Sequence, residues 1–207
     1  DCLRLNIWTP GLADGKRRPV LVWLHGGGFT QGNGIEQDSY DGENIARYGD
    51  IVFCSVNHRL GALGFSDLAG AGGEKYRHSG NAGMLDIVAA LKWIQANIAN
   101  FGGDPSNVTV MGQSGGGSKV CLLCAMPAAK GLFHKAVALS GNTVKANNAD
   151  YAERLGNAIL HEAGLDTSQV DSLQSVPWEQ YLELANRARQ RMAAEDPGSR
   201  SGFAPVA

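Results

Sequence analysis

The chain has 207 residues, of which 43% are hydrophobic and 18% charged, and its formal net charge at pH 7 is −2. These values are typical of a protein that folds around one apolar core. The small net charge gives no reason to expect nucleic acid or an anionic membrane surface as a partner. No run approaches the roughly 18 consecutive apolar residues of a membrane span.

The beginning of the chain and its cysteines do not indicate a cellular compartment or a cofactor. The chain begins at Asp1 without a methionine and shows no signal peptide, so we expect residues to precede it and assign neither a compartment nor an oligomeric state. Four cysteines do not make a disulfide framework at this length. Cys121 and Cys124 spell C-x-x-C, a pattern of redox or zinc sites, but their apolar neighbours favour two small buried residues. No second cysteine pair, P-loop or G-x-G-x-x-G is present, so we expect neither a metal nor an organic cofactor.

Alternation and apolar runs predict the first elements. Apolar residues alternate over 3–8, which is the period of a half-buried strand. A continuous apolar run over 20–24 predicts an inner strand that is covered on both faces. A short helix with acidic residues in its first turn follows over 41–48, and a buried strand over 51–56. The glycine-rich connection over 61–73 is predicted to be irregular.

The second half continues the alternation of strands and helices. Apolar residues recur at three- and four-residue spacing over 82–99, which predicts the clearest helix. We then expect a strand at 108–111, a buried helix at 119–125, a strand at 136–140, helices at 150–163 and 177–195, a loop at 196–202 and the first half of a strand at 203–206. This order predicts an α/β fold with a doubly wound, mostly parallel sheet and helices on both faces.

The stretch that carries chemistry is Gly112-Gln-Ser-Gly-Gly116, which fits G-x-S-x-G. This pattern, together with an HGGG loop, marks the nucleophile elbow and the oxyanion hole of α/β-hydrolases. A serine hydroxyl becomes a useful nucleophile only when it is exposed, close to a base and near donors that hold the developing oxyanion. A strand precedes Ser114 and a helix follows it, which is the context that the motif requires. The backbone N–H of Gly115 then lies at a helix N-terminus.

A second glycine motif follows the inner strand at 20–24, where the chain reads His25-Gly-Gly-Gly-Phe29. One interpretation is a loop that packs closely under another segment. The other is that its backbone N–H groups face an anion, since glycine lets a ligand approach the main chain. The G-x-S-x-G motif later in the chain favours the second interpretation.

Five segments, together covering much of the chain, are specific enough to compare with known families: 1–10, 19–29, 57–65, 80–86 and 97–117. On these segments the chain closely resembles the type-B carboxylesterase and cholinesterase family of α/β-hydrolases. Its amino-acid sequence, including residues 125–133, is most similar to microbial carboxylesterases. The resemblance implies that Ser114 is the acyl-accepting nucleophile. It also implies that the N–H groups of Gly27, Gly28 and Gly115 form the oxyanion hole.

The chain departs from the family pattern in two places. Family elbows usually read G-E-S-A-G, whereas Gln113 and Gly115 stand here for the acid and the alanine, although both changes keep the backbone N–H. The triad order in this fold is serine, acid, histidine. His134 has no acid between it and the serine, and His161 lies beside its nearest acids on one predicted helix. We therefore expect 1–207 to be an internal fragment of a single catalytic domain, inactive alone, with the triad acid and histidine beyond residue 207.

These features predict a serine carboxylic-ester hydrolase, a carboxylesterase that acts on small-molecule esters through an acyl-enzyme on Ser114. A catalytically silent cholinesterase-like interaction domain is the alternative from another class, since such relatives keep the fold and lose the nucleophile or its base. A peptidase or thioesterase on the same fold would differ only in the acyl pocket.

Overall fold

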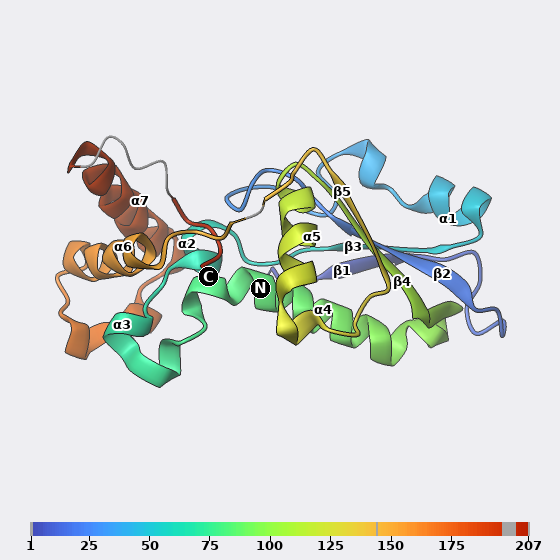
Figure 1. The fold of residues 1–207 in the computed structure, drawn as a ribbon, viewed down its shortest axis with the longest axis horizontal. Coiled ribbons are helices and arrows are strands. Elements are labelled where there is room, and N and C mark those ends of the chain that lie inside the picture. The colour runs from blue at the N-terminus through green and yellow to red at the C-terminus, as the bar shows by residue number, and fades with distance from the viewer. Residues whose placement is uncertain (1, 144, 196–201, 207) are drawn as a thin grey trace. The chain divides into compact units, whose positions relative to one another are not determined.

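A computed structural model describes residues 2–143, 145–195 and 202–206 (Figure 1). The chain forms two compact units. The first unit comprises residues 1–58 and 84–144, and the second comprises residues 59–83 and 145–207.

A five-stranded sheet is the centre of the first unit (Figure 1). Its strands are β1 (Leu5–Trp8), β2 (Arg18–Leu24), β3 (Val52–Val56), β4 (Gly103–Gln113) and β5 (Lys135–Leu139). They lie in the order β1-β3-β2-β4-β5. β1 pairs antiparallel with β3, and all other neighbours are parallel. The carboxyl ends of four strands therefore gather at one edge, which is where sites form in open α/β sheets.

Burial along the strands follows their places in the sheet. Every residue of the inner strand β3 is buried, which confirms the buried strand predicted over 51–56. In β2, Val20, Val22 and Leu24 are fully buried, whereas Leu21 and Trp23 on the opposite face are half-buried. Edge strand β5 is largely exposed.

Helices cover both faces of this sheet, which confirms the predicted fold class (Figure 1). They are α1 (Glu43–Gly49), α4 (Ala82–Asn97) and α5 (Gly115–Ala125), with 3-10 turns at Asp38–Tyr40, Ile98–Phe101 and Pro127–Ala129. α4 buries Met84, Leu91 and Ile94 completely, so its apolar positions supply much of the core. Trp23 and residues from α1 line a cavity of about 440 Å³ on the other face.

The second unit consists of helices. They are α2 (Gly61–Phe65), α3 (Ala69–Gly72), α6 (Ala149–Glu162) and α7 (Trp178–Glu195), with 3-10 helices at Gly73–Tyr76, Ser79–Asn81 and Thr167–Ser175. α6 and α7 pack together through one apolar face each, including the fully buried Ile159 and Ala185. The Asn148 side chain caps α6 by accepting from the backbone N–H of Tyr151 over 2.9 Å.

Two expectations for irregular segments differ from the structure. The prediction that 61–73 is irregular was wrong, because α2 and α3 form there. α2 buries Ala62 and Phe65, and Leu68 between the two helices is also buried. At 203–206 the structure shows an isolated parallel bridge from Val206 to Asn147 in place of a strand. Residues 196–201, most of the predicted loop, lie outside the described residues.

The two cysteines of the C-x-x-C pair were also predicted wrongly. Cys124 is exposed and Cys121 is half-buried, because the apolar face of α5 is formed by Val120 and Leu123 instead. All four cysteines are free thiols. Within the described residues, no helix combines the length and apolar character that a bilayer span requires.

Candidate active site

Ser114 lies at the sharp junction between β4 and α5. Its backbone has φ 55° and ψ −119°, a conformation that non-glycine residues rarely adopt and that clusters at functional sites. Two hydrogen bonds hold this turn: its N–H donates to Leu139 O over 2.8 Å, and its carbonyl accepts from the Ser118 N–H over 3.0 Å. The strained backbone is therefore fixed by β5 on one side and by α5 on the other, and the side chain is left half-exposed.

The glycines of the elbow bring its helix close to the sheet. A Cβ on Gly112 would lie 2.8 Å from the Cα of Gly116, and a Cβ on Gly116 would lie 2.9 Å from the carbonyl carbon of Leu24. Contacts this short do not occur for real side chains. Glycine at both positions is therefore what lets α5 start directly above the ends of β2 and β4.

The glycine loop after β2 has a fixed backbone. Gly27 and Gly28 have φ +80° and +65°, in the region that favours glycine. The carbonyl of Gly27 accepts from the N–H groups of Thr30 and Gln31 over 3.3 and 3.2 Å. Because a peptide unit is planar, holding this carbonyl also fixes the direction of the Gly28 N–H on the same peptide.

His25 fixes the preceding peptide of the loop. Its ring Nδ1 lies 2.9 Å from the Gly26 carbonyl, whose peptide carries the Gly27 N–H. The ring is buried and stacked on His58, with centroids 5.2 Å apart and planes at 16°. Burial, and then the charge of Lys119, lower the pKa of His25 to about 4. The ring is thus neutral at pH 7, and we assign the proton to Nδ1 as donor to Gly26.

The loop and the elbow meet at Gly115. A Cβ on this residue would lie 2.5 Å from both the backbone nitrogen and the Cα of Gly28. A Cβ on Gly26 would likewise lie 3.6 Å from the Cβ of Ser114. The structure thus brings Ser114, Gly115 and Gly28 together, with Gly27 beside them in the loop. It also gives a reason for glycine where family elbows carry alanine, since the Gly28 backbone occupies that space.

None of the five histidines is hydrogen-bonded to Ser114 in the part of the chain that the structure describes. His25 and His58 are buried, whereas His78, His134 and His161 are exposed. His134 accepts from the Val108 N–H through Nδ1 over 3.2 Å, six positions before Ser114 along β4. That the triad histidine is neither His134 nor His161 stays a prediction.

Lys119 is the residue of this region that the sequence analysis overlooked. It lies on α5 with 0% of its surface exposed, and its Nζ donates to His25 O over 3.0 Å. Burial is the largest cause that lowers its pKa, to about 7, and the charge of Glu36 opposes this shift. A lysine inside a predicted buried helix was the available signal, because lysine is almost never fully buried without a partner.

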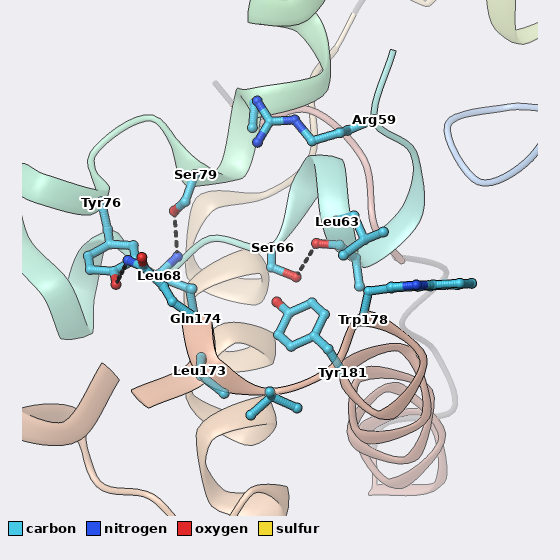
Figure 2. A pocket seen from close by; sticks show the side chains of 13 residues that line it. Arg59, Leu63, Ser66, Leu68, Tyr76, Ser79, Leu173, Gln174, Trp178 and Tyr181 are labelled. Carbon is cyan, nitrogen blue, oxygen red and sulfur yellow. Dashed lines mark hydrogen bonds between the residues drawn. The ribbon is translucent and has the colours of Figure 1, made fainter. Parts of the chain in front are cut away.

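The second unit contains a separate cavity of about 340 Å³ (Figure 2). Its walls are mostly apolar and include Leu63, Leu68, Leu173 and Trp178. Polar groups on the walls bond to the protein itself: Ser66 Oγ donates to Ala62 O over 2.7 Å, and the Gln174 amide donates to the Tyr76 hydroxyl over 2.7 Å. The cavity can hold an apolar group, but its polar atoms are already engaged.

Potential metal ligands do not gather in the described residues, where no group of three or more His, Cys, Asp or Glu is placed to hold an ion. Burial raises the pKa of the Cys54 thiol to about 12, so this cysteine is a poor nucleophile. The strained turn at Ser114, with the Gly28 backbone against Gly115, is what makes this serine the candidate for nucleophilic chemistry.

Comparison with known proteins assigns the chain to a family. The model of the carboxylesterase family matches residues 1–207. The chain belongs to the carboxylesterase family, a family of carboxylic ester hydrolases. It is 43% identical over 189 residues to the para-nitrobenzyl esterase of Bacillus subtilis (strain 168), a match that covers 91% of the chain and 37% of that protein. It is 42% identical over 184 residues to the phenmedipham hydrolase of Pseudarthrobacter oxydans, covering 88% and 35%.

Solved structures agree with the α/β-hydrolase fold. The carboxylesterase EST55 of Geobacillus stearothermophilus superposes with a TM-score of 0.87 at 41% identity, and covers 100% of this chain and 41% of its own. An esterase from Clostridium hathewayi superposes with a TM-score of 0.85 at 44% identity, covering 99% and 40%. The chain thus spans well under half the length of the relatives that it matches.

Proposed function

We propose that residues 1–207 supply the nucleophile and the oxyanion hole of a serine carboxylic-ester hydrolase, as an internal part of a single α/β-hydrolase catalytic domain. One observation carries this proposal: Ser114 is held at positive φ between β4 and α5, where the Gly28 backbone lies against Gly115. The similarity to a para-nitrobenzyl esterase and a phenmedipham hydrolase supports hydrolysis as the reaction class, with small-molecule esters as substrates.

The proposed reaction is acyl transfer through Ser114. Ser114 Oγ attacks the ester carbonyl carbon and gives its proton to a base, and the carbonyl oxygen becomes an oxyanion. The N–H groups of Gly27, Gly28 and Gly115 stabilise this charge, and each such donor typically contributes about 10²–10³ in kcat. Collapse of the tetrahedral intermediate breaks the C–O bond to the alcohol, which leaves with the proton from the base. Water then attacks the acyl-enzyme by the same steps, and the acid is released.

The base and its acid are part of the same proposal. Removing the histidine of a comparable triad lowers kcat about 10⁶-fold, so a Ser114 without one would be nearly inert. The matched relatives are more than twice the length of this chain. We therefore propose that the acid and the histidine come from the full-length gene product outside residues 1–207, in the order serine, acid, histidine.

A fluorophosphonate probe on the full-length gene product tests the proposal. Attack by an activated Ser114 forms an Oγ–P bond and expels fluoride, and peptide mass spectrometry then locates the adduct. We expect label on the peptide that contains Ser114, and loss of both label and esterase activity in Ser114→Ala. A folded, full-length protein that takes up no label would contradict the proposal and favour a silent interaction domain.

A further inference from the structure

Lys119 is buried in a place where its charge is costly. The side chain is fully inaccessible, and within the described residues its Nζ has one hydrogen-bond acceptor, the backbone carbonyl of His25. A buried ion pair would need a carboxylate at hydrogen-bonding distance, and Glu36 acts on Lys119 only through its charge. An apolar side chain of similar length would fill this space without the desolvation cost. The lysine therefore has a stability cost that packing does not explain.

The acceptor of this bond is the first residue of the oxyanion loop. His25 follows the last residue of β2, and its carbonyl belongs to the peptide that carries the Gly26 N–H. The next peptide is held by the His25 ring at the Gly26 carbonyl, and the one after it by Thr30 at the Gly27 carbonyl. Three successive peptides are thus each held by a donor, and the donor on the first of them is Lys119.

The same lysine is attached to the helix that presents the nucleophile. α5 begins at Gly115, directly after Ser114, and Lys119 lies about one turn further along. Its bond to His25 therefore connects the start of the loop to the elbow helix at a second point, in addition to the packing of Gly28 on Gly115. The geometry points to Lys119 as a positioning residue, which holds the oxyanion loop at a fixed distance from Ser114. This inference rests on the proposed function of the loop.

The first measurement is steady-state ester hydrolysis by the full-length gene product and its Lys119→Met variant. Methionine fills the space and removes the donor. Because the loop donors would then be misplaced and not deleted, we expect kcat to fall about 10- to 100-fold with KM changed by less than about twofold. Lys135→Met is the matched control, since Lys135 is exposed at the start of β5 and its Nζ donates a hydrogen bond to Asn107 Oδ1 on the neighbouring strand β4. This control should retain wild-type kcat.

A transition-state analogue separates positioning from a general loss of structure. A trifluoromethyl ketone forms a tetrahedral adduct with Ser114 and places an oxyanion in the hole, whereas the matching methyl ketone binds mainly as a planar ground-state analogue. In Lys119→Met the inhibition constant of the trifluoromethyl ketone should rise by the same factor as kcat/KM falls. The inhibition constant of the methyl ketone should stay within about twofold of its wild-type value. Lys119→Gln keeps an N–H donor and should recover part of both losses.

Each outcome has one meaning. If the wild-type protein takes up no fluorophosphonate at Ser114, the proposed function fails and the inference fails with it. If Ser114 is labelled but Lys119→Met retains wild-type kcat and trifluoromethyl ketone affinity, the positioning role alone is overturned. If Lys119→Met does not fold, Lys119→Leu, which also removes the donor, gives the same comparison. If neither variant folds, Lys119 is a folding residue and the inference is wrong.

Discussion

Two buried cations at opposite ends of β2 show how differently one sheet treats a charge. Arg18, the first residue of β2, is 4% exposed and bonds to Asp14 over 2.6 and 3.0 Å and to Asp50 over 2.7 Å. Lys119 lies on α5, and its side chain donates a hydrogen bond to the carbonyl of His25, the residue that follows the carboxyl end of the same strand. Asp14 and then Asp50 raise the pKa of Arg18, whereas burial lowers the pKa of Lys119 to about 7.

The difference separates an end where the buried charge is paired from the end where we propose that the chemistry takes place. At the amino end of the parallel strands the charge of Arg18 is matched, and the two carboxylates take its donors in good geometry. At the carboxyl end the charge of Lys119 lacks such a match, the backbone of Ser114 is strained and the loop is built from glycine. Natural proteins depart from stable local choices mainly at functional sites. The carboxyl end fits that rule.

The strongest prediction concerns Gly115 at the carboxyl end. In Gly115→Ala the new Cβ would collide with the nitrogen and Cα of Gly28, so the loop must move away from Ser114. We expect kcat to fall about 10²–10³-fold, the cost of a lost oxyanion donor, with the thermal midpoint much less affected. Gly49→Ala at the amino end is the control, because a Cβ there would meet Ile51 at an ordinary 3.7 Å. Wild-type kcat in Gly115→Ala would show that the loop accommodates an alanine without losing its N–H donors, as the G-E-S-A-G elbows of the family do, and would contradict the expected displacement of Gly28.

The next prediction is that Lys119→Met stabilises the protein while it impairs catalysis. The pKa of Lys119 is about 7 in the folded protein and 10.5 as the reference for the unfolded chain. A lowered lysine pKa is a cost that is complete below about pH 7 and disappears as the pH rises to about 10.5. Relief of this cost, less the lost hydrogen bond, should raise the free energy of unfolding by about 3 kcal/mol at pH 7. His25 is neutral throughout this range.

Denaturant unfolding of both full-length proteins at pH 7 and pH 10 measures this effect. The gain of Lys119→Met should be large at pH 7 and nearly absent at pH 10. A variant that is less stable than the wild type at pH 7 would mean that Lys119 serves the fold, as Arg18 does, and the contrast between the two ends would be lost.

Arg18→Met should show the opposite behaviour. The Arg18 guanidinium, by its hydrogen bonds, lowers the pKa of Asp14 from 3.8 to about 2. A lowered carboxyl pKa contributes stability that is complete above about pH 4 and is lost as the pH falls through about 2. We therefore expect the variant to unfold at a lower temperature at pH 7, with a deficit that narrows between pH 4 and pH 2. Its kcat under conditions where it is folded should equal that of the wild type, and a fall in kcat would contradict the assignment.

The structure confirms the local backbone features that the sequence predicted, the strand–turn–helix at Ser114 and the glycine loop after β2, whereas the roles of their residues stay predictions. The elbow and the oxyanion loop were readable because a strand, its glycines and the following helix are consecutive in the chain. The contact of Lys119 with His25 was not readable, because the two residues lie 94 positions apart, although the place of this lysine in a predicted buried helix signalled that it needs a partner. The α2 and α3 helices were missed for a related reason, since many glycines favour a loop while the burial of Phe65 decides the outcome.

The smallest effect is expected for Arg17, whose ion pair matches those of Arg18 in length but differs in exposure. Its Nη2 lies 2.7 Å from Asp104 Oδ1, but the Arg17 side chain is 68% exposed because neighbouring residues of a chain entering a strand point to opposite sides. Water and salt screen such a pair, and its long side chain loses freedom when it is held. Arg17→Met should therefore change the thermal midpoint by less than about 2 °C at pH 7 and leave kcat unchanged. A loss as large as that of Arg18→Met would mean that the ion pair itself, and not its burial between two carboxylates, stabilises the amino end of the sheet.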